Sequence, residues 1–220
     1  MEYKSYKTQS GIVRHDILCD NFKTACITVD FFIKLDKTNA SYLSLVSSVL
    51  KRGNAKYGEM DKIGEFLDKN YGASFGVSVA KTGDMQRLSI TCGYMDDRYA
   101  LEGEKVSGNM VSLIENTLFA PLTENGAFKQ SFVEQEKRNL KDKIASLVNE
   151  KRQYSLEKCK QTMFKDDIYG VYEQGDPEVI DTITPSALYN FFTDVIKKSM
   201  VYICYAGSKT DTDLLFKPLI

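Results

Sequence analysis

Five stretches of the chain alternate apolar with polar residues, which is the period-two pattern of half-buried β-strands. The predicted strands span residues 12–18, 25–35, 73–79, 88–94 and 201–206. The first of them places Val13, His15 and Ile17 on one apolar face. Polar connections at residues 19–23 and 81–84 are typical of tight turns, so we expect two hairpins, one from the first two strands and one from the third and fourth.

Elsewhere, apolar residues recur every three or four positions, which predicts amphipathic helices. These helices are expected to begin near residues 40, 60, 97, 128, 156 and 185. Gly72 follows the second helix and suits the left-handed conformation that ends many helices. Thr184 precedes Pro185, a pair that suits the N-cap and the first turn of the last helix.

The order of these elements favours an α+β fold. The strands come in pairs that are separated by blocks of helix, which indicates an antiparallel or mixed sheet with helices packed on one face. The 220 residues, of which 43% are apolar and 27% are charged, suffice for one large domain or two small ones. The sequence contains no internal repeat and no low-complexity linker.

Charge and composition exclude several classes of function. The formal net charge is −1, and acidic residues interleave the basic ones over residues 134–152, so we expect no nucleic-acid partner. The N-terminal ten residues lack the apolar run of a secretory signal, and no stretch approaches the roughly 20 apolar residues of a membrane helix, so no membrane partner is expected. Five scattered cysteines without a CxxC pair predict reduced thiols and a cytoplasmic protein.

The histidine count limits the chemistry. His15 is the only histidine, so a Ser–His or Cys–His dyad would have to use it, and no GxSxG motif accompanies it. On an apolar strand face, it is more typical of a core or edge side chain. Zinc motifs with two histidines are excluded by counting, and no spacing suggests a site built from His15, carboxylates and cysteines. Phosphate-binding glycine loops are also missing. We therefore expect a protein that binds rather than catalyses, without a cofactor.

Four short segments carry a resemblance to a known family. They read VLKRG at residues 49–53, FLDKNYGA at 66–73, FVEQEK at 132–137, and MF at 163–164 with YG at 169–170. Together with the order of the elements, they make residues 12–207 similar to the N-terminal domain of the M16 peptidases, the insulinase and mitochondrial-processing-peptidase group. The resemblance is closest to bacterial M16-like pairs in which one partner has lost the catalytic motif. It implies a single domain over residues 1–220, the first half of a longer two-half chain, with an exposed apolar end at 214–220.

This chain keeps none of the three defining residues of the family's zinc motif, HxxEH. The resemblance places Ser44 and Ser48 at the two histidine positions and Ser47 at the general-base position. Lys143 stands at the third ligand position, seven residues after Glu136. A serine hydroxyl is a poor zinc ligand and an ammonium repels the ion, so the resemblance implies no metal and no catalytic residue. The serines either lie without a role on the polar side of a helix or line a relic cavity that holds a ligand or water.

A second family feature concerns peptide binding. Active relatives hold an extended substrate along an edge strand after the Gly-Ala turn, and here that strand would be residues 73–79. The resemblance therefore implies peptide binding by Gly76, Val77, Ser78 and Val79, nearest the former metal site. It also implies a heterodimer with an active M16 peptidase subunit.

Two other functions stay open at this point. An active zinc-dependent peptidase could use a non-standard site, for example one that includes Glu136. A stand-alone peptide-binding or scaffolding module would need only the edge strand. The first function predicts stoichiometric zinc in the purified protein. The second predicts that the full-length protein binds no M16-type partner.

Overall fold

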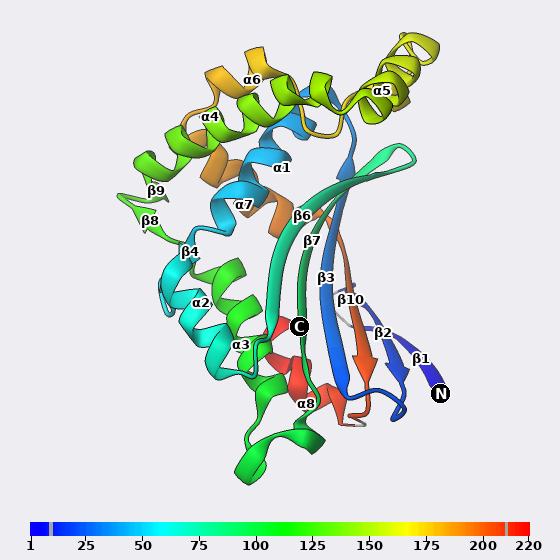
Figure 1. Cartoon of the computed structure of the whole chain (residues 1–220), viewed down its shortest axis with the longest axis vertical. Coiled ribbons are helices and arrows are strands. Elements are labelled where there is room, and N and C mark those ends of the chain that lie inside the picture. The colour runs from blue at the N-terminus through cyan, green and yellow to red at the C-terminus, as the bar shows by residue number, and fades with distance from the viewer. Residues whose placement is uncertain (9–10, 210) are drawn as a thin grey trace.

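A mixed six-stranded sheet organises the computed structural model, which describes residues 1–8, 11–209 and 211–220. The strand order is β1-β2-β10-β3-β7-β6. The strands are β1 (Glu2–Lys7), β2 (Val13–Leu18), β3 (Thr24–Lys34), β6 (Ser74–Thr82), β7 (Met85–Met95) and β10 (Met200–Gly207). β2 and β10 are parallel, whereas the other neighbours are antiparallel. The predicted α+β fold with a mixed sheet is confirmed (Figure 1).

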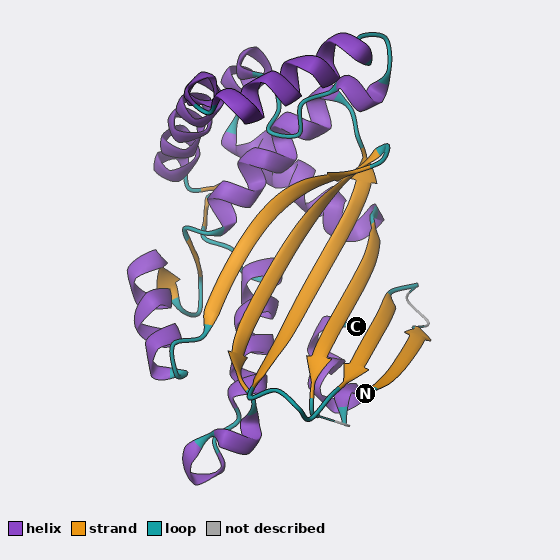
Figure 2. Ribbon diagram, turned by 45° about the vertical axis from the view of Figure 1, so that its right-hand side comes forward, coloured by secondary structure: helices purple, strands orange, loops and turns teal. Residues whose placement is uncertain are grey.

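Helices cover one face of this sheet, and the other face is turned toward the viewer in Figure 2. The helices are α1 (Lys37–Leu50), α2 (Met60–Lys69), α3 (Val106–Phe119), α4 (Gln130–Ser146), α5 (Lys151–Met163), α6 (Pro177–Thr182), α7 (Pro185–Lys198) and α8 (Thr212–Phe216). Short strands form two ribbons, β4 (Gly53–Asn54) with β5 (Gly58–Glu59) and β8 (Thr123–Glu124) with β9 (Ala127–Phe128). Single 3₁₀ turns occur at Asp97–Tyr99, Leu101–Gly103, Leu147–Asn149, Ile168–Gly170 and Lys217–Leu219. None of the helices in the described ranges combines the length and apolarity that membrane crossing requires.

α1 lies at the centre of the helical layer. Nine of its fourteen residues are buried, more than a one-sided amphipathic helix would bury. Asp36 begins the helix as its N-cap, because its carboxylate accepts a hydrogen bond of 2.7 Å from the main-chain N–H of Asn39. Alternate residues of β3 and β7, such as Ile27 and Ile90, face this layer and are completely buried. Burial of each such side chain stabilises the fold by about 1.5–3 kcal/mol.

The local turn and cap predictions are confirmed. Gly72 follows α2 with a φ of +67°, in the left-handed region, as expected. Thr184 caps α7 by accepting a hydrogen bond of 3.2 Å from the N–H of Ala187. β6 and β7 form the predicted hairpin, and Gly83 has a φ of +58° at the first position of its two-residue turn.

The predicted hairpin at residues 19–23 is wrong. β10 lies between β2 and β3, parallel to the first and antiparallel to the second. A polar connection looks the same whether the two strands pair or a distant strand inserts between them. β1 was also missed, because an edge strand that is largely exposed has no apolar face to produce a periodic pattern.

The predicted apolar face of β2 is wrong as well. Ile17 is exposed, whereas Arg14 and Asp16 are buried on the opposite face, where they form an ion pair of 3.2 Å. These side chains point toward the C-terminal segment, in which the Thr212 hydroxyl donates to Asp16 across 2.6 Å. His15 lies on the other face, stacked between two tyrosine rings rather than in the core.

Part of the apolar end of the chain is packed, contrary to expectation, whereas Leu214 and Ile220 are exposed as expected. Leu215, Phe216 and Leu219 are at most 7% exposed, and the two leucines flank a phenylalanine that is fully buried. Leu215 and Phe216 lie in α8 and Leu219 lies in the 3₁₀ turn that follows, and both elements pack near α3.

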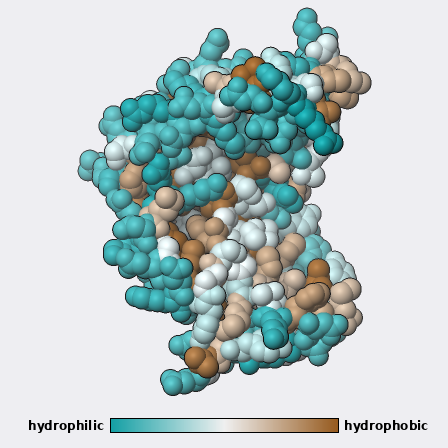
Figure 3. Space-filling view, viewed as in Figure 1, coloured by the Kyte–Doolittle hydropathy of each residue, from teal (hydrophilic) through white to brown (hydrophobic). Residues whose placement is uncertain are grey.

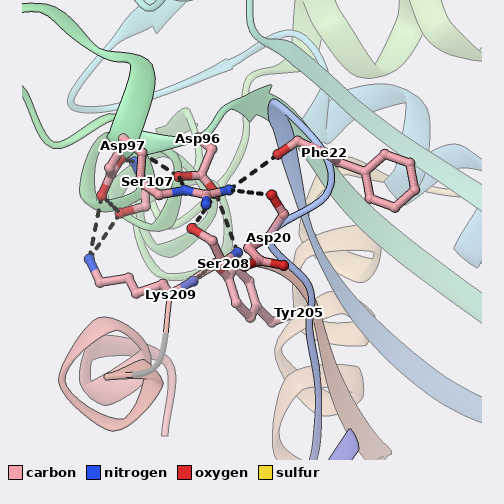
Figure 4. Close-up of polar contacts among 9 residues, drawn as sticks. Asp20, Phe22, Asp96, Asp97, Ser107, Tyr205, Ser208 and Lys209 are labelled. Atoms are coloured by element: carbon pink, nitrogen blue, oxygen red, sulfur yellow. Dashed lines mark hydrogen bonds and ion pairs between the residues drawn. The ribbon is translucent and has the colours of Figure 1, made fainter. Parts of the chain in front are cut away.

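One buried carboxylate ties together three connections at one end of the sheet (Figure 4). Asp96, which is 3% exposed, accepts hydrogen bonds from Arg98 and from the hydroxyl and N–H of Ser208. Arg98 in turn donates to the main-chain oxygens of Asp20 and Phe22. Burial alone opposes ionisation of Asp96, but the hydrogen bonds from Ser208 and Arg98 outweigh it and lower the pKa of this carboxyl.

We expect Asp96→Asn to lower the free energy of unfolding by about 1–3 kcal/mol, because hydrogen bonds to a charged acceptor are lost in a buried place. The folded-state pKa of Asp96 lies below its ordinary value, so its contribution is complete above that value and is lost as pH falls through the folded pKa. Urea unfolding followed by circular dichroism should therefore show a steeper loss below about pH 4 for the wild type than for the variant.

The matched control for this prediction is Asp20→Asn. Asp20 carries the same charge in the same cluster, but only its main-chain oxygen contacts Arg98. Equal destabilisation by the two substitutions would contradict the role assigned to Asp96.

Candidate functional site

α1 and α4 come together beside β6 and enclose a pocket of about 260 Å³. We call it the α1–α4 pocket. It is lined by Ser47, Ser48, Lys51, Ser78, Val79, Glu136, Asn139, Leu140, Lys143 and Gln174. Three of the four positions expected from the lost zinc motif therefore converge here, namely Ser47, Ser48 and Lys143. Two of the four expected peptide-binding residues, Ser78 and Val79, lie in the same pocket.

Ser44, the fourth position, points elsewhere. Its hydroxyl donates to the main-chain oxygen of Glu173 across 2.8 Å, and it is 1% exposed. The hydroxyls of Ser47 and Ser48 both donate to the main-chain oxygen of Ser44, at 2.8 and 3.3 Å. The interpretation that these serines lie on the polar side of the helix is wrong for Ser44 and Ser47, which are buried. Each satisfies its own hydroxyl within the protein, as buried polar groups must.

The segment after the fourth 3₁₀ turn is fastened across α1. The main-chain oxygen of Glu173 accepts a second hydrogen bond, of 2.8 Å, from the amide of Gln86. The N–H of Asp176 donates to the hydroxyl of Ser41 across 2.9 Å. Gly175 has a φ of +89°, and a Cβ there would lie 2.4 Å from the Cα of Ser41, so this position accepts only glycine. Consequently, the main chain of residues 173–176 fills the space next to the side chain of Ser44.

Two ammonium groups face the α1–α4 pocket. Lys143 donates to the side-chain oxygen of Gln174 across 3.0 Å. Lys51 follows the last turn of α1, one helical turn after Ser47 and Ser48. Partial burial, and then repulsion by Lys143, lower the pKa of Lys51, while Glu136 acts in the opposite direction.

Glu136 is the one acidic residue of the pocket within the described part of the chain, and it is already paired. It is 9% exposed and forms an ion pair with Arg52, whose Nε lies 2.6 Å from its Oε1. Asn139 donates to the same oxygen across 3.1 Å. The guanidinium thus compensates this carboxylate and leaves the lysine charges uncompensated.

These residues do not fit zinc. A zinc site needs three or four thiolate, imidazole or carboxylate donors, and the pocket offers one carboxylate that an arginine already binds. The ammonium groups of Lys51 and Lys143 would also repel a metal cation in the pocket. Among the described residues, no three histidine, cysteine or acidic side chains are grouped closely enough to hold a metal ion.

β6 forms one edge of the sheet, because in the described ranges it pairs with β7 alone. The direction of its main-chain groups follows from the register. The N–H of Leu35 donates to the oxygen of Asp84, and these two residues lie opposite each other, next to the Lys34–Met85 pair. Hydrogen-bonded pairs alternate along an antiparallel ladder, so the even-numbered residues of β7 bond to β3. The odd-numbered residues of β7 therefore bond to β6. The partners of those odd-numbered residues in β6 are even-numbered, such as Ser78 opposite Ser89.

Consequently, the odd-numbered residues of β6 direct their N–H and C=O groups to the free edge. Of the four residues expected to bind peptide, Val77 and Val79 therefore present main-chain groups outward. Gly76 and Ser78 bond to β7, and the side chain of Ser78 lies on the open face of the sheet. Val77 has a buried side chain, whereas that of Val79 is half-buried and lines the pocket.

Sequence reasoning missed three polar residues of the pocket. Lys51 and Asn139 could have been found, because each lies one helical turn from a residue already singled out, Ser47 and Lys143. Gln174 comes from a connection with no periodic pattern, so no local signal marks it.

The chain is similar to several known proteins in sequence and in fold. No family model matches the chain. Over 197 residues it is 26% identical to YmfF, a probable inactive metalloprotease of Bacillus subtilis, and the match covers 90% of this chain and 46% of that protein. A conserved protein from Enterococcus faecalis has a TM-score of 0.89 with 25% identity, covering 97% of this chain and 50% of the other.

The inactive domain of an M16 peptidase from Pseudomonas fluorescens has a TM-score of 0.70, over 98% of this chain and 48% of that one. At 16% identity, this likeness shows the fold alone. The chain spans about half the length of the relatives it matches. The chain therefore shares the fold of M16 peptidase domains, and over most of its length it is similar in sequence to a probable inactive metalloprotease.

Proposed function

We propose that the chain is part of a non-catalytic M16-like subunit that holds extended peptides along β6 and works beside an active M16 peptidase. The observation that carries the proposal is the free edge of β6, whose outward main-chain groups at Val79 open directly onto the α1–α4 pocket. An exposed strand edge binds an extended peptide through main-chain hydrogen bonds, which need no particular side chain. This binding mode therefore survives the loss of the zinc ligands.

The composition of the pocket supports binding rather than peptide hydrolysis. A zinc peptidase activates water on the metal and uses a carboxylate as the base. The corresponding positions here are Ser44, Ser47, Ser48 and Lys143, none of which supplies either function. The alternative of an active zinc peptidase would have to rely on Glu136, which is bound by Arg52.

A partner peptidase is the second part of the proposal. In it, residues 1–220 form the first half of a longer cytoplasmic chain, which pairs with a subunit that keeps HxxEH. Affinity purification of the full-length protein from its own cells, followed by mass spectrometry, is expected to recover a near-stoichiometric protein that carries this motif. Recovery of no M16-type protein would instead favour the alternative of a stand-alone peptide-binding or scaffolding module.

We expect Val79→Pro to weaken peptide binding, because proline removes an N–H that points to the free edge and leaves the bonds between β6 and β7 intact. Loss of one main-chain hydrogen bond should reduce affinity by about two- to tenfold. Fluorescence anisotropy of the full-length protein with a fluorescein-labelled pool of random nonapeptides measures this change.

Val79→Ala is the matched control for the proline variant. Alanine keeps the N–H and trims the same half-buried side chain, so affinity should stay close to that of the wild type. Equal affinities for the proline and alanine variants would rule out the edge of β6 as the binding place.

We further expect that restoring the family residues does not restore a zinc site. A fourfold variant with Ser44→His, Ser47→Glu, Ser48→His and Lys143→Glu should lose about 1–3 kcal/mol of stability, because an imidazole at residue 44 needs space that the segment at Glu173 occupies. Zinc analysis and urea unfolding of the purified full-length variant test this.

Ser48→His alone serves as the control, since this half-buried position accepts a larger side chain more readily. A fourfold variant with stoichiometric zinc and wild-type stability would show that the pocket keeps the geometry of a catalytic site.

A further inference from the structure

The α1–α4 pocket carries positive charge that no described residue neutralises. The Nζ atom of Lys51 has no hydrogen-bond or ion-pair partner in the described part of the chain, and that of Lys143 bonds only to the neutral Gln174 there. Glu136 is compensated by Arg52. Two ammonium groups in one pocket, with the nearest carboxylate already paired, create a site that favours an anion.

The neutral groups of the pocket add to this preference. Ser47 and Ser48 direct their hydroxyl protons to the main chain of α1 and are not available as donors. Asn139 uses one amide proton for Glu136 and keeps the other. A bound anion would therefore receive charge-assisted hydrogen bonds from the lysines and a neutral one from Asn139.

The position of the pocket indicates what kind of molecule would bring the anion. Val79 lines it and also directs its main-chain groups to the free edge of β6. A peptide that pairs with this part of β6 therefore passes the two ammonium groups. Carboxylates are the anions that peptides carry, and one placed between Lys51 and Lys143 would offset the repulsion that, after burial, lowers the pKa of Lys51.

We propose that Lys51 and Lys143 bind a carboxylate of a peptide that pairs with β6. This inference rests on the proposed function and adds a preference to it, namely peptides that place a negative charge in the α1–α4 pocket. The carboxylate can be the C-terminus of the peptide or the side chain of an aspartate or glutamate. Both sources present the same chemistry to the lysines, so the experiment separates them.

Three fluorescein-labelled nonapeptide pools with random neutral residues test the proposal on the full-length protein. The first pool ends in a free carboxylate, the second is amidated, and the third is amidated with one aspartate at a random position. We expect the amidated neutral pool to bind about tenfold more weakly than the better of the two charged pools at low salt. The difference should shrink as salt rises, because screening weakens contacts between exposed charges.

The double variant Lys51→Gln with Lys143→Gln should abolish the difference between the pools. Lys141→Gln is the matched control, because it removes the same charge from α4 at a residue that pairs with Asp181 outside the pocket. It should preserve the difference. A free-carboxylate preference identifies a peptide C-terminus as the ligand, and an aspartate preference identifies a side chain.

The failures of this inference and of the proposed function are distinguishable. If all three pools bind equally and Val79→Pro weakens each of them, the edge of β6 binds peptides but the lysines select no carboxylate, and the inference is overturned. If the wild-type protein binds none of the pools, peptide binding by β6 itself is overturned. A preference for charged pools that survives the double lysine variant assigns the carboxylate to another place and also overturns the inference.

Discussion

The burial of α1 is the constraint on which the rest of this molecule depends. A helix that is covered on most of its surface cannot leave its polar side chains to water, so each must find a partner inside the protein. Ser44 meets this requirement by bonding to Glu173, and Ser41 does so by accepting from the N–H of Asp176. These two contacts fix the segment between them across the helix, and the same segment carries Gln174 to Lys143. The shape of the α1–α4 pocket is thus a consequence of how one buried helix satisfies its hydroxyls.

The charge of the pocket follows from a second contact at the end of the same helix. Arg52 lies just past α1 and binds Glu136 of α4, which joins the two helices through a pair that is largely removed from water. Breaking such a pair would leave an uncompensated charge in a place of low polarity, at a cost of about 3–5 kcal/mol. The carboxylate is therefore held by the packing of the helices and is not available to neutralise Lys51 or Lys143. At the place where active relatives bind a metal cation, a few different side chains give this chain a pocket that favours an anion. The helices that carry these side chains keep the same arrangement.

Local features of this fold could be predicted from the sequence, and distant ones could not. The N-cap Thr184, the left-handed Gly72 and the turn at Gly83 each depend on a few neighbouring residues, and each was predicted. The insertion of β10 between β2 and β3 depends on residues far apart in the chain, so the connection at 19–23 gave no sign of it. Likewise, the burial of Arg14 depends on a partner, Asp213, that lies at the other end of the sequence.

The same division holds within the candidate site. Helical spacing brings Ser47, Ser48 and Lys51 to one face of α1 and its C-terminus, and it brings Lys143 to the facing side of α4 once the pairing of the two helices is assumed. The family resemblance supplied that pairing. It did not predict that Ser44 turns away to Glu173, because the segment that binds it comes from an irregular connection. The sequence thus predicted that Ser47, Ser48 and Lys143 meet, whereas the place of Ser44 and the partner of each hydroxyl required the structure.

The free edge of β6 indicates which kind of ligand the positively charged pocket binds. Soluble proteins protect exposed strand edges with charged residues, proline or bulges, because unpaired main-chain groups recruit other chains. Residues 75–80 of β6 read FGVSVA and contain none of these protective features. An edge of this kind is stable in solution when something pairs with it, and the residues nearest its middle open onto two lysines. The edge requires an extended main chain, and the lysines require a negative charge. A peptide carrying a carboxylate satisfies both requirements at once, whereas an uncharged strand would leave the ammonium groups opposed to one another.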